Sequence, residues 1–441
     1  MFVQIHMLQS MPPGNPNRDE NGQPKKCIFG RVTRARISSQ CLKRNIREYL
    51  RSVSGEARWK DVFEKGLADR TQWLPRMVGD QLSKVTPDIT EDELSGIKAV
   101  LAKQFRKEEK RAEPEDGDEA DKEASAPKEP AASGPDQTGQ LVFFPPPFAK
   151  EVAILIANFR KQERDAYREW VGMTPDQPKL TKDQRKKLSK GEEKELKGEE
   201  KKIKDQIKNF EHEVKELSNS LTVDIALFGR MTTSDLVVNV EAACQVAHAI
   251  STHEAIIERD WLTAMDDKKA EFAPTQTKEI GAAYIGSESF FDSAVYYKYL
   301  NLDLDEIKKH LSWTDERAAH AAGVFLEAAV RANPTGKQNA FANHGAHELI
   351  LVEVSEKKWP ISYANAFLKA VEGENLMTES AKALSAYIGS VAKAFSPSDT
   401  RRALLAVGSA ALEIDGAKRA DTLDALVDWV AVPVRGRGAA A

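Results

Sequence analysis

Apolar and polar residues alternate at the start of the chain, as they do in a half-buried strand. Phe2 to Leu8 follows this period of two and is predicted to be a strand. A loop rich in Pro, Gly and Asn covers Ser10 to Gly30. A helix is then predicted from Ser38 or Ser39 to about Val53, because serine is a favoured N-cap residue.

This first helix is predicted to be amphipathic. Its apolar residues are Leu42, Ile46, Tyr49, Leu50 and Val53, and its opposite side carries Lys43, Arg44, Arg47 and Arg51. A face that is only solvated usually mixes charges for pairing one turn apart, but Glu48 is the lone acidic residue here. We interpret the basic side as a phosphate-binding face, assisted by free N–H groups at the helix N-terminus. A solvated outer face is the alternative.

The middle of the chain is mostly helical and polar. Residues 53–105 are predicted to be mainly helical, and 107–139 is predicted to be a disordered acidic loop because it lacks apolar periodicity. About two-thirds of residues 179–205 are charged, which is typical of a solvated helix or arm. Apolar residues then recur with a 4-3-4-3 spacing from Ile203 to Leu217, so this arm is expected to dock on another element.

The second half contains denser apolar segments. The pattern predicts strands at Val223–Phe228, Phe290–Leu302 and Leu349–Val354, and helices after Asn239, at Asp315–Ala332, Ile361–Val371, Glu379–Ala394 and Ala420–Val430. Strands paired around helices, with helical insertions, predict an α+β fold.

Composition excludes several classes of protein. The chain has 441 residues, 41% of them apolar, and a mean hydropathy of −0.49, which is typical of a soluble protein. No stretch approaches the roughly 20 apolar residues that cross a bilayer, and the first ten residues do not form a signal peptide. Three cysteines are too few and scattered for a disulfide scaffold. We therefore expect a cytoplasmic protein with no membrane partner.

Charge is segregated along the sequence. Lys and Arg number 64 against 68 Asp and Glu, a formal net charge of −4, which argues mildly against a protein that coats nucleic acid uniformly. Residues 25–51, however, are strongly basic, and residues 108–136 are strongly acidic. Local charge is therefore a better guide to the partner than the sum.

The sequence contains little that indicates catalysis or metal binding. The chain has no P-loop, G-x-S-x-G or H-E-x-x-H motif. The pair His344 and His347 lacks a third ligand, and His6, His248 and His253 are interpreted as structural. We expect no metal and no cofactor.

Two groups of apolar residues lie beside polar segments and are candidates for contacts with nucleic-acid bases. Met231 follows Gly229-Arg230, and Trp261-Leu262 follows Asp260. If exposed, these side chains could act as wedges that separate stacked bases; core packing is the alternative.

Nine short motifs carry a family resemblance. They are Asn17-Arg18-Asp19, Ile28-Phe29-Gly30, residues 36–44, residues 223–231, Val246-Ala247-His248-Ala249 with Thr252-His253, residues 260–267, Ile285-Gly286, Tyr296-Tyr297-Lys298-Tyr299 and Gly336-Lys337-Gln338. In this order and spacing the chain resembles the CasC-type backbone subunit of Cascade, the type I-E CRISPR surveillance complex. The resemblance covers roughly residues 1–55 and 220–370.

The resemblance implies a fold and its division into domains. A modified RNA-recognition-motif (ferredoxin-like) palm would comprise residues 1–55 and 220–375, with a protruding hairpin thumb at about 260–285. A helical fingers insertion would span 56–219 and include the acidic loop at 107–139. C-terminal helices at 376–441 would pack on the palm.

The resemblance also implies a function without catalysis. Several copies would polymerise along a crRNA with other Cascade subunits, and each thumb would flip a nucleotide out while the remaining bases pair with target DNA. The implied RNA-binding residues are Arg18, Arg36, Gln40, Lys43, Arg44, Arg47, Lys337 and Gln338, and the implied wedge is Met231, Trp261 and Leu262.

Two alternatives remain. The first is an enzyme of the same fold that cuts RNA with the loop carboxylate Asp19. The second is a generic helical scaffold that assembles through the stripe from Ile203 to Leu217 without nucleic acid.

Overall fold

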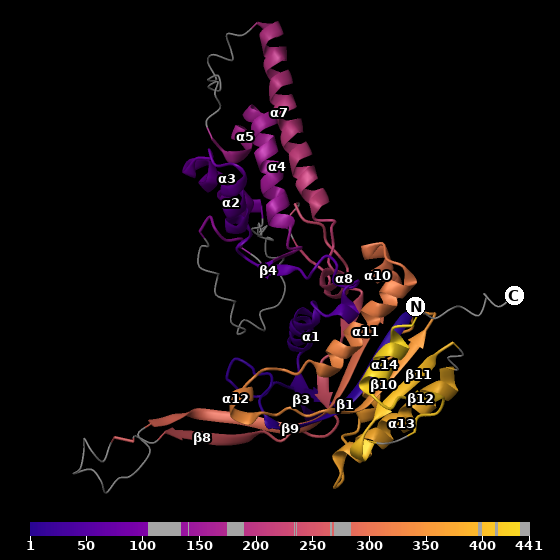
Figure 1. The fold of residues 1–441 in the computed structure, drawn as a ribbon. Helices are drawn as coiled ribbons and strands as arrows, with labels where there is room; N and C mark the ends of the chain where they lie inside the picture. The colour runs from indigo at the N-terminus through magenta and orange to yellow at the C-terminus, as the bar shows by residue number, and fades with distance from the viewer. Residues whose placement is uncertain are drawn as a thin grey trace, which may run out of the picture. The chain divides into compact units, whose positions relative to one another are not determined.

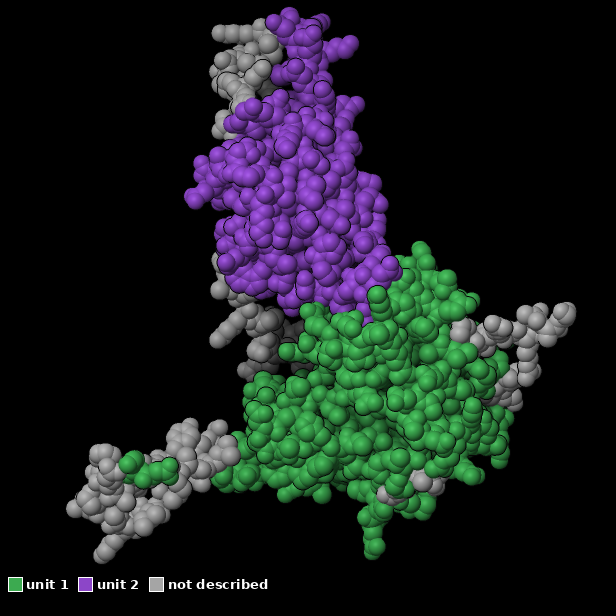
Figure 2. Space-filling model, in the orientation of Figure 1, with its two compact units in different colours: residues 1–62, 243–441 green, residues 63–242 purple. Residues whose placement is uncertain are grey.

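The computed structural model describes residues 1–104, 134–139, 141–173, 189–232, 234, 236–264, 267–268, 284–395, 399–410 and 413–432. The chain forms two compact units, residues 1–62 with 243–441 (unit 1) and residues 63–242 (unit 2), coloured separately in Figure 2. Most of the predicted acidic loop and of the predicted thumb tip lies outside the described residues. Within the described part, no helix is long and apolar enough to cross a membrane.

A mixed sheet forms the centre of unit 1 (Figure 1). The long strand β1 (Phe2–Gly14) lies between β9 (Tyr284–Asp303) and β10 (His347–Ser355) and is antiparallel to both. The other strands are β2 (Lys26–Phe29), β3 (Val32–Ile37), β6 (Cys244–Val246), β7 (Ala249–Ser251), β8 (Glu258–Ala264), β11 (Arg401–Ala406) and β12 (Ala417–Arg419). The order is β12-β11-β10-β1-β9-β7-β3-β2, and β6 and β8 also pair with β9. Only the β11–β12 pair is parallel in the described residues.

Six α-helices and three short 3₁₀ helices accompany the described part of this sheet. They are α1 (Ser39–Val53), α10 (Leu304–Leu311), α11 (Asp315–Arg331), α12 (Gln338–Phe341), α13 (Leu376–Phe395), α14 (Leu423–Val430), η1 (Ala57–Trp59), η3 (Tyr363–Phe367) and η4 (Gly408–Ala410). Helix α13 and η3 cover one face, where Leu384 and Phe367 pack with Tyr297 and Leu351 in a buried cluster. Helix α1 packs against α11. The predicted strands at 2–8, 290–302 and 349–354 are confirmed.

Three predicted elements are wrong. Val223–Phe228 is a short helix, α8, because six residues, five of them apolar, satisfy either period. The segment after Asn239 forms β6 and β7 rather than a helix, and β6 alternates buried, exposed and buried residues. The chain after residue 376 contains strands β11 and β12 as well as the expected helices, and only η3 forms within Ile361–Val371.

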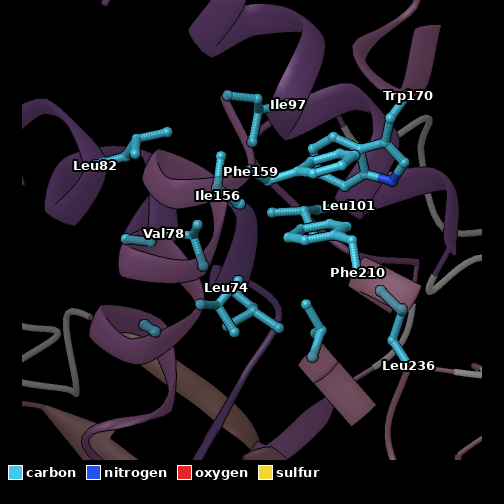
Figure 3. Packing of buried hydrophobic residues seen from close by; sticks show 14 of the residues in the cluster. Leu74, Val78, Leu82, Ile97, Leu101, Ile156, Phe159, Trp170, Phe210 and Leu236 are labelled. Carbon is cyan, nitrogen blue, oxygen red and sulfur yellow. The ribbon is translucent and has the colours of Figure 1, made fainter. Parts of the chain in front are cut away.

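Unit 2 is built around its own apolar core. It comprises α2 (Leu74–Val85), α3 (Glu91–Gln104), α4 (Phe148–Gln162), α5 (Arg164–Val171), α7 (Lys190–Leu217), α8 (Val223–Phe228) and the two-stranded sheet β4 (Asp69–Thr71) and β5 (Val142–Phe144). Figure 3 shows this core, in which Phe159 and Phe210 stack with ring centroids 4.4 Å apart. Phe210 and Val214 of α7 are buried here, so the predicted docking of the 203–217 stripe is confirmed within this unit.

Candidate nucleic-acid interface

Helix α1 presents its basic side to solvent, as its sequence predicts. Ser38 caps the helix by accepting a hydrogen bond from Cys41 N–H at 3.3 Å. The buried residues are Leu42, Ile46, Leu50 and Val53. On the other side Gln40 and Arg44 are exposed, and Lys43 and Arg47 are half-buried. Four of the predicted RNA-binding side chains therefore follow one accessible helix face.

The loop that carries Arg18 is fastened to the start of α1. Asn17 Oδ1 accepts a hydrogen bond from Ser38 N–H at 2.8 Å, and the Asn17 carbonyl accepts one from Lys25 N–H at 2.9 Å. The Lys25 carbonyl in turn accepts a hydrogen bond from Arg36 N–H at 2.8 Å. These bonds place the exposed Arg18 and the half-buried Arg36 beside the helix.

A second loop carries Lys337 and meets the Arg18 loop. A Cβ atom on Gly336 would lie 2.5 Å from the Pro16 carbonyl oxygen, so the two backbones are in close contact there. Lys337 Nζ donates a 2.7 Å hydrogen bond to Ser289 Oγ on β9. Gln338 uses its amide N–H groups within its own loop, toward the Pro334 carbonyl at 2.8 Å and Asn343 Oδ1 at 2.6 Å. Lys337 thus joins the cationic group, whereas the Gln338 amide holds the loop.

The β8–β9 hairpin extends from the sheet next to these loops (Figure 1). Trp261 on β8 lies opposite Glu288, one position along from Ser289, the anchor of Lys337. Its side chain is 53% exposed, as a wedge requires. The side chain of Leu262 lies outside the described part of the structure.

Met231, the third predicted wedge residue, belongs to unit 2. It is 93% exposed and follows Arg230, whose buried guanidinium donates hydrogen bonds to the carbonyls of Val238, Phe143 and Ser218. Arg230 is thus a structural residue that holds the backbone before Met231. Trp261 belongs to unit 1, so the predicted wedge draws its residues from both units.

The N-terminus of α1 differs from the expectation. The N–H groups of Ser38, Ser39 and Cys41 donate to Asn17 Oδ1, His248 Nδ1 and Ser38 Oγ respectively. The N–H groups of Ser38 and Ser39, which were expected to be free for an anion, are therefore bound within the protein.

Two residues near this position were missed by the sequence analysis. Lys25 lies just before β2, and His248, interpreted there as structural, is exposed in the turn between β6 and β7. Burial and the nearby charges of Arg36 and Lys25 lower the pKa of His248. The signal available in the sequence was the short alternation around residue 248, which places the histidine in a turn between strands.

The other candidate groups have structural contacts. Asp19 Oδ1 accepts hydrogen bonds from the N–H groups of Asn21 and Gln23, both at 2.9 Å, and so shapes its loop. His347 is buried, 3.1 Å from Lys298 Nζ, while His344 is exposed. Within the ranges that the structure covers, no three His, Cys, Asp or Glu side chains are grouped so that they could hold a metal ion.

Comparison with known proteins identifies the family. The model of a family described as "CT1975-like protein" matches residues 3–429. The chain belongs to this family. The CT1975-like chain is similar to one in a structure titled "CRISPR RNA-guided surveillance complex, pre-nicking", with 25% identity, a TM-score of 0.67, and 98% of this chain and 99% of that chain covered. A second structure, "CRISPR RNA-guided surveillance complex", gives 22% identity, a TM-score of 0.61 and the same coverage. No curated protein matches the CT1975-like chain.

Proposed function

We propose that this CT1975-like protein is a backbone subunit of a CRISPR surveillance complex and that several copies polymerise along the spacer of a crRNA. The similarity over nearly the whole chain to a subunit of an RNA-guided complex supports this role. The observation that carries it is the convergence in unit 1 of cations from α1, the Arg18 loop and the Lys337 loop beside the β8–β9 hairpin. We further assign the complex to type I-E, and the sheet of unit 1 to a modified RNA-recognition-motif palm.

The chemistry of the cationic surface fits a guide of any sequence. Lys and Arg side chains neutralise phosphates without reading bases, so the surface would hold the RNA backbone and leave base edges to pair with target DNA. The exposed Trp261, with Leu262 and Met231, would push out one nucleotide at regular intervals. The subunit would work with other Cascade subunits and would itself catalyse no step.

Charge reversal on α1 tests this role. In the double variant Lys43→Glu and Arg47→Glu we expect RNA to be absent from the purified protein, because two phosphate contacts become repulsive. The matched control is Lys382→Glu with Lys393→Glu on α13, which makes the same change of charge on another exposed surface. Circular dichroism and the melting temperature check that both variants fold. Equal RNA content in the α1 variant, the control and the wild type would refute the proposal.

A further inference from the structure

Side chains from three separate segments meet at the start of α1. Strands β3 and β7 pair at Ile37 and Ala249, which brings the end of β3 next to the β6–β7 turn that holds His248. Arg36 Nη1 and Ser39 N–H each lie 3.3 Å from the same atom, His248 Nδ1. The Lys25 backbone is bonded to Arg36, and the charges of both residues act on His248. The cluster therefore consists of one histidine between two cations.

The contacts fix the protonation of the imidazole ring. A backbone N–H and a guanidinium can only donate hydrogen bonds, so Nδ1 must accept them and carries no proton. Burial, Arg36 and Lys25 lower the pKa of His248, which keeps the ring neutral near neutral pH. A neutral ring without a proton on Nδ1 carries its proton on Nε2. His248 therefore offers one N–H donor on the side away from Ser39.

The surroundings of this donor suit an anion. The side chain of His248 is exposed, and Gln40, one residue after Ser39, is exposed as well. The guanidinium of the half-buried Arg36 lies beside the same ring and supplies a positive charge there. Hydrogen bonds donated into Nδ1 polarise the ring and strengthen Nε2–H as a donor. His248 thereby presents an N–H donor to solvent beside the positive end of α1, where the Ser39 N–H is already bound.

We propose that His248 donates its Nε2–H to a non-bridging phosphate oxygen of the bound RNA strand, in a site completed by the cationic side chains of Arg36 and Lys25. This inference rests on the proposed function and adds a residue to its RNA-binding surface. A phosphate fits better than a base, because the flanking cations favour a negative charge. A neutral donor adds a contact without adding repulsion between the two cations.

Two substitutions of His248 separate its inner and outer contacts. Asparagine places an oxygen near the position of Nδ1 and retains the acceptor for Ser39 N–H, but it does not reach outward. Glutamine places an amide N–H near the position of Nε2 and retains the outer donor. We measure binding of single-stranded oligouridine RNA to the full-length protein over a range of salt concentrations, together with the melting temperature.

We expect His248→Asn to weaken RNA binding about tenfold, the loss of one hydrogen bond to a charged group, at an unchanged melting temperature. Its salt dependence should equal that of the wild type, because no charge has been removed. His248→Gln should bind within about threefold of the wild type. Lys25→Met should both weaken binding and reduce the slope of log affinity against log salt by about 0.7, as expected for one phosphate contact on a single strand.

The outcomes distinguish this inference from the proposed function. Wild-type affinity in His248→Asn overturns the inference and leaves the proposed function intact. A lower salt slope in His248→Asn also overturns it, because the ring would then bind as a cation. If both His248 variants lose RNA affinity in proportion to a fall in melting temperature, the histidine is merely structural and the inference is overturned. Failure of the wild type to bind RNA overturns the proposed function itself.

Discussion

Because of Lys298, we expect the stability of unit 1 to increase as the pH rises from 7 to 10. This β9 residue is 1% exposed, and its Nζ donates hydrogen bonds to Gln9 Oε1 at 2.6 Å and to His347 Nε2 at 3.1 Å. Neither partner carries a charge: Gln9 is an amide, and burial and the Lys298 charge lower the pKa of His347 well below its usual range, which keeps its ring neutral. Burial lowers the pKa of Lys298 to about 7. The substitution Lys298→Met removes the titrating group and keeps a side chain of similar length.

The size of the effect follows from proton linkage. An unfolded lysine titrates near pH 10.4, so between pH 7 and pH 10 the unfolded chain binds more protons at this position than the folded one. The free energy of unfolding of the wild type therefore rises with pH in this range. Each pH unit contributes up to about 1.4 kcal/mol, which gives on the order of 4 kcal/mol between pH 7 and pH 10 relative to Lys298→Met. Below about pH 6 both states are protonated and the difference is constant.

Urea titrations at pH 7, 8, 9 and 10 measure this effect, with the folded fraction of unit 1 read from pulsed hydrogen exchange of the β9 peptide. Tyrosines and cysteines also titrate in this range, so the informative quantity is the free energy of unfolding of the wild type minus that of the variant at each pH. Lys382→Met, at an exposed position of α13, is the matched control and should leave the pH dependence unchanged. A wild-type and Lys298→Met pair whose stabilities change in parallel from pH 7 to 10 would refute the reasoning.

Two further predictions concern stability. Gly30→Ala should destabilise unit 1 by about 3 kcal/mol or more, because φ is +62° and the new Cβ would lie 1.7 Å from the Leu368 carbonyl oxygen. The control is Gly22→Ala, where φ is +79° but no atom lies within 4 Å of the new Cβ. This variant should cost only about 1 kcal/mol in the same urea assay. Although burial alone would raise it, contacts with His6 and Arg402 hold the pKa of Glu353 at about 2. This carboxylate therefore contributes stability above pH 4 that is lost as the pH falls toward 2. In Glu353→Gln the free energy of unfolding should fall less steeply between pH 5 and pH 3 than in the wild type. An equally steep fall in both proteins would show that the carboxylate does not titrate as argued.

Long elements could be predicted from the sequence because their pattern repeats several times. The alternation in β1 and the one-sided apolar stripe of α1 each occur over enough residues to exclude the other period. The short segments 223–228 and 243–250 contain too few repeats, and their conformation depends on tertiary contacts. For example, Asp224 is buried at the start of α8, where its carboxylate accepts a hydrogen bond from Ala68 N–H at 3.0 Å.

The site was predictable only where one element sets the direction of its side chains. Helical geometry places Lys43 and Arg44 on the outer face of α1, and the structure agrees. Charge alone does not distinguish Arg34 from Arg36, two residues apart on β3. Arg34 is fully buried and donates hydrogen bonds to the carbonyls of Phe29, Ser251 and Phe367, whereas Arg36 remains accessible beside His248. That difference depends on β7 and η3, which are distant in sequence, so no local pattern contains it.

The cationic surface is held in place by neutral contacts. Asn17 fastens the Arg18 loop to α1, the backbones of Lys25 and Arg36 bond to each other, and Gly336 allows the Lys337 loop to lie against Pro16. None of these contacts involves a charged side chain, so their strength does not depend on phosphates or salt. A surface ordered before RNA arrives loses little conformational entropy on binding, which favours affinity without base contacts. It also follows that reversing charges on α1 changes the attraction for RNA more than the position of the loops, which is what makes charge reversal an informative test.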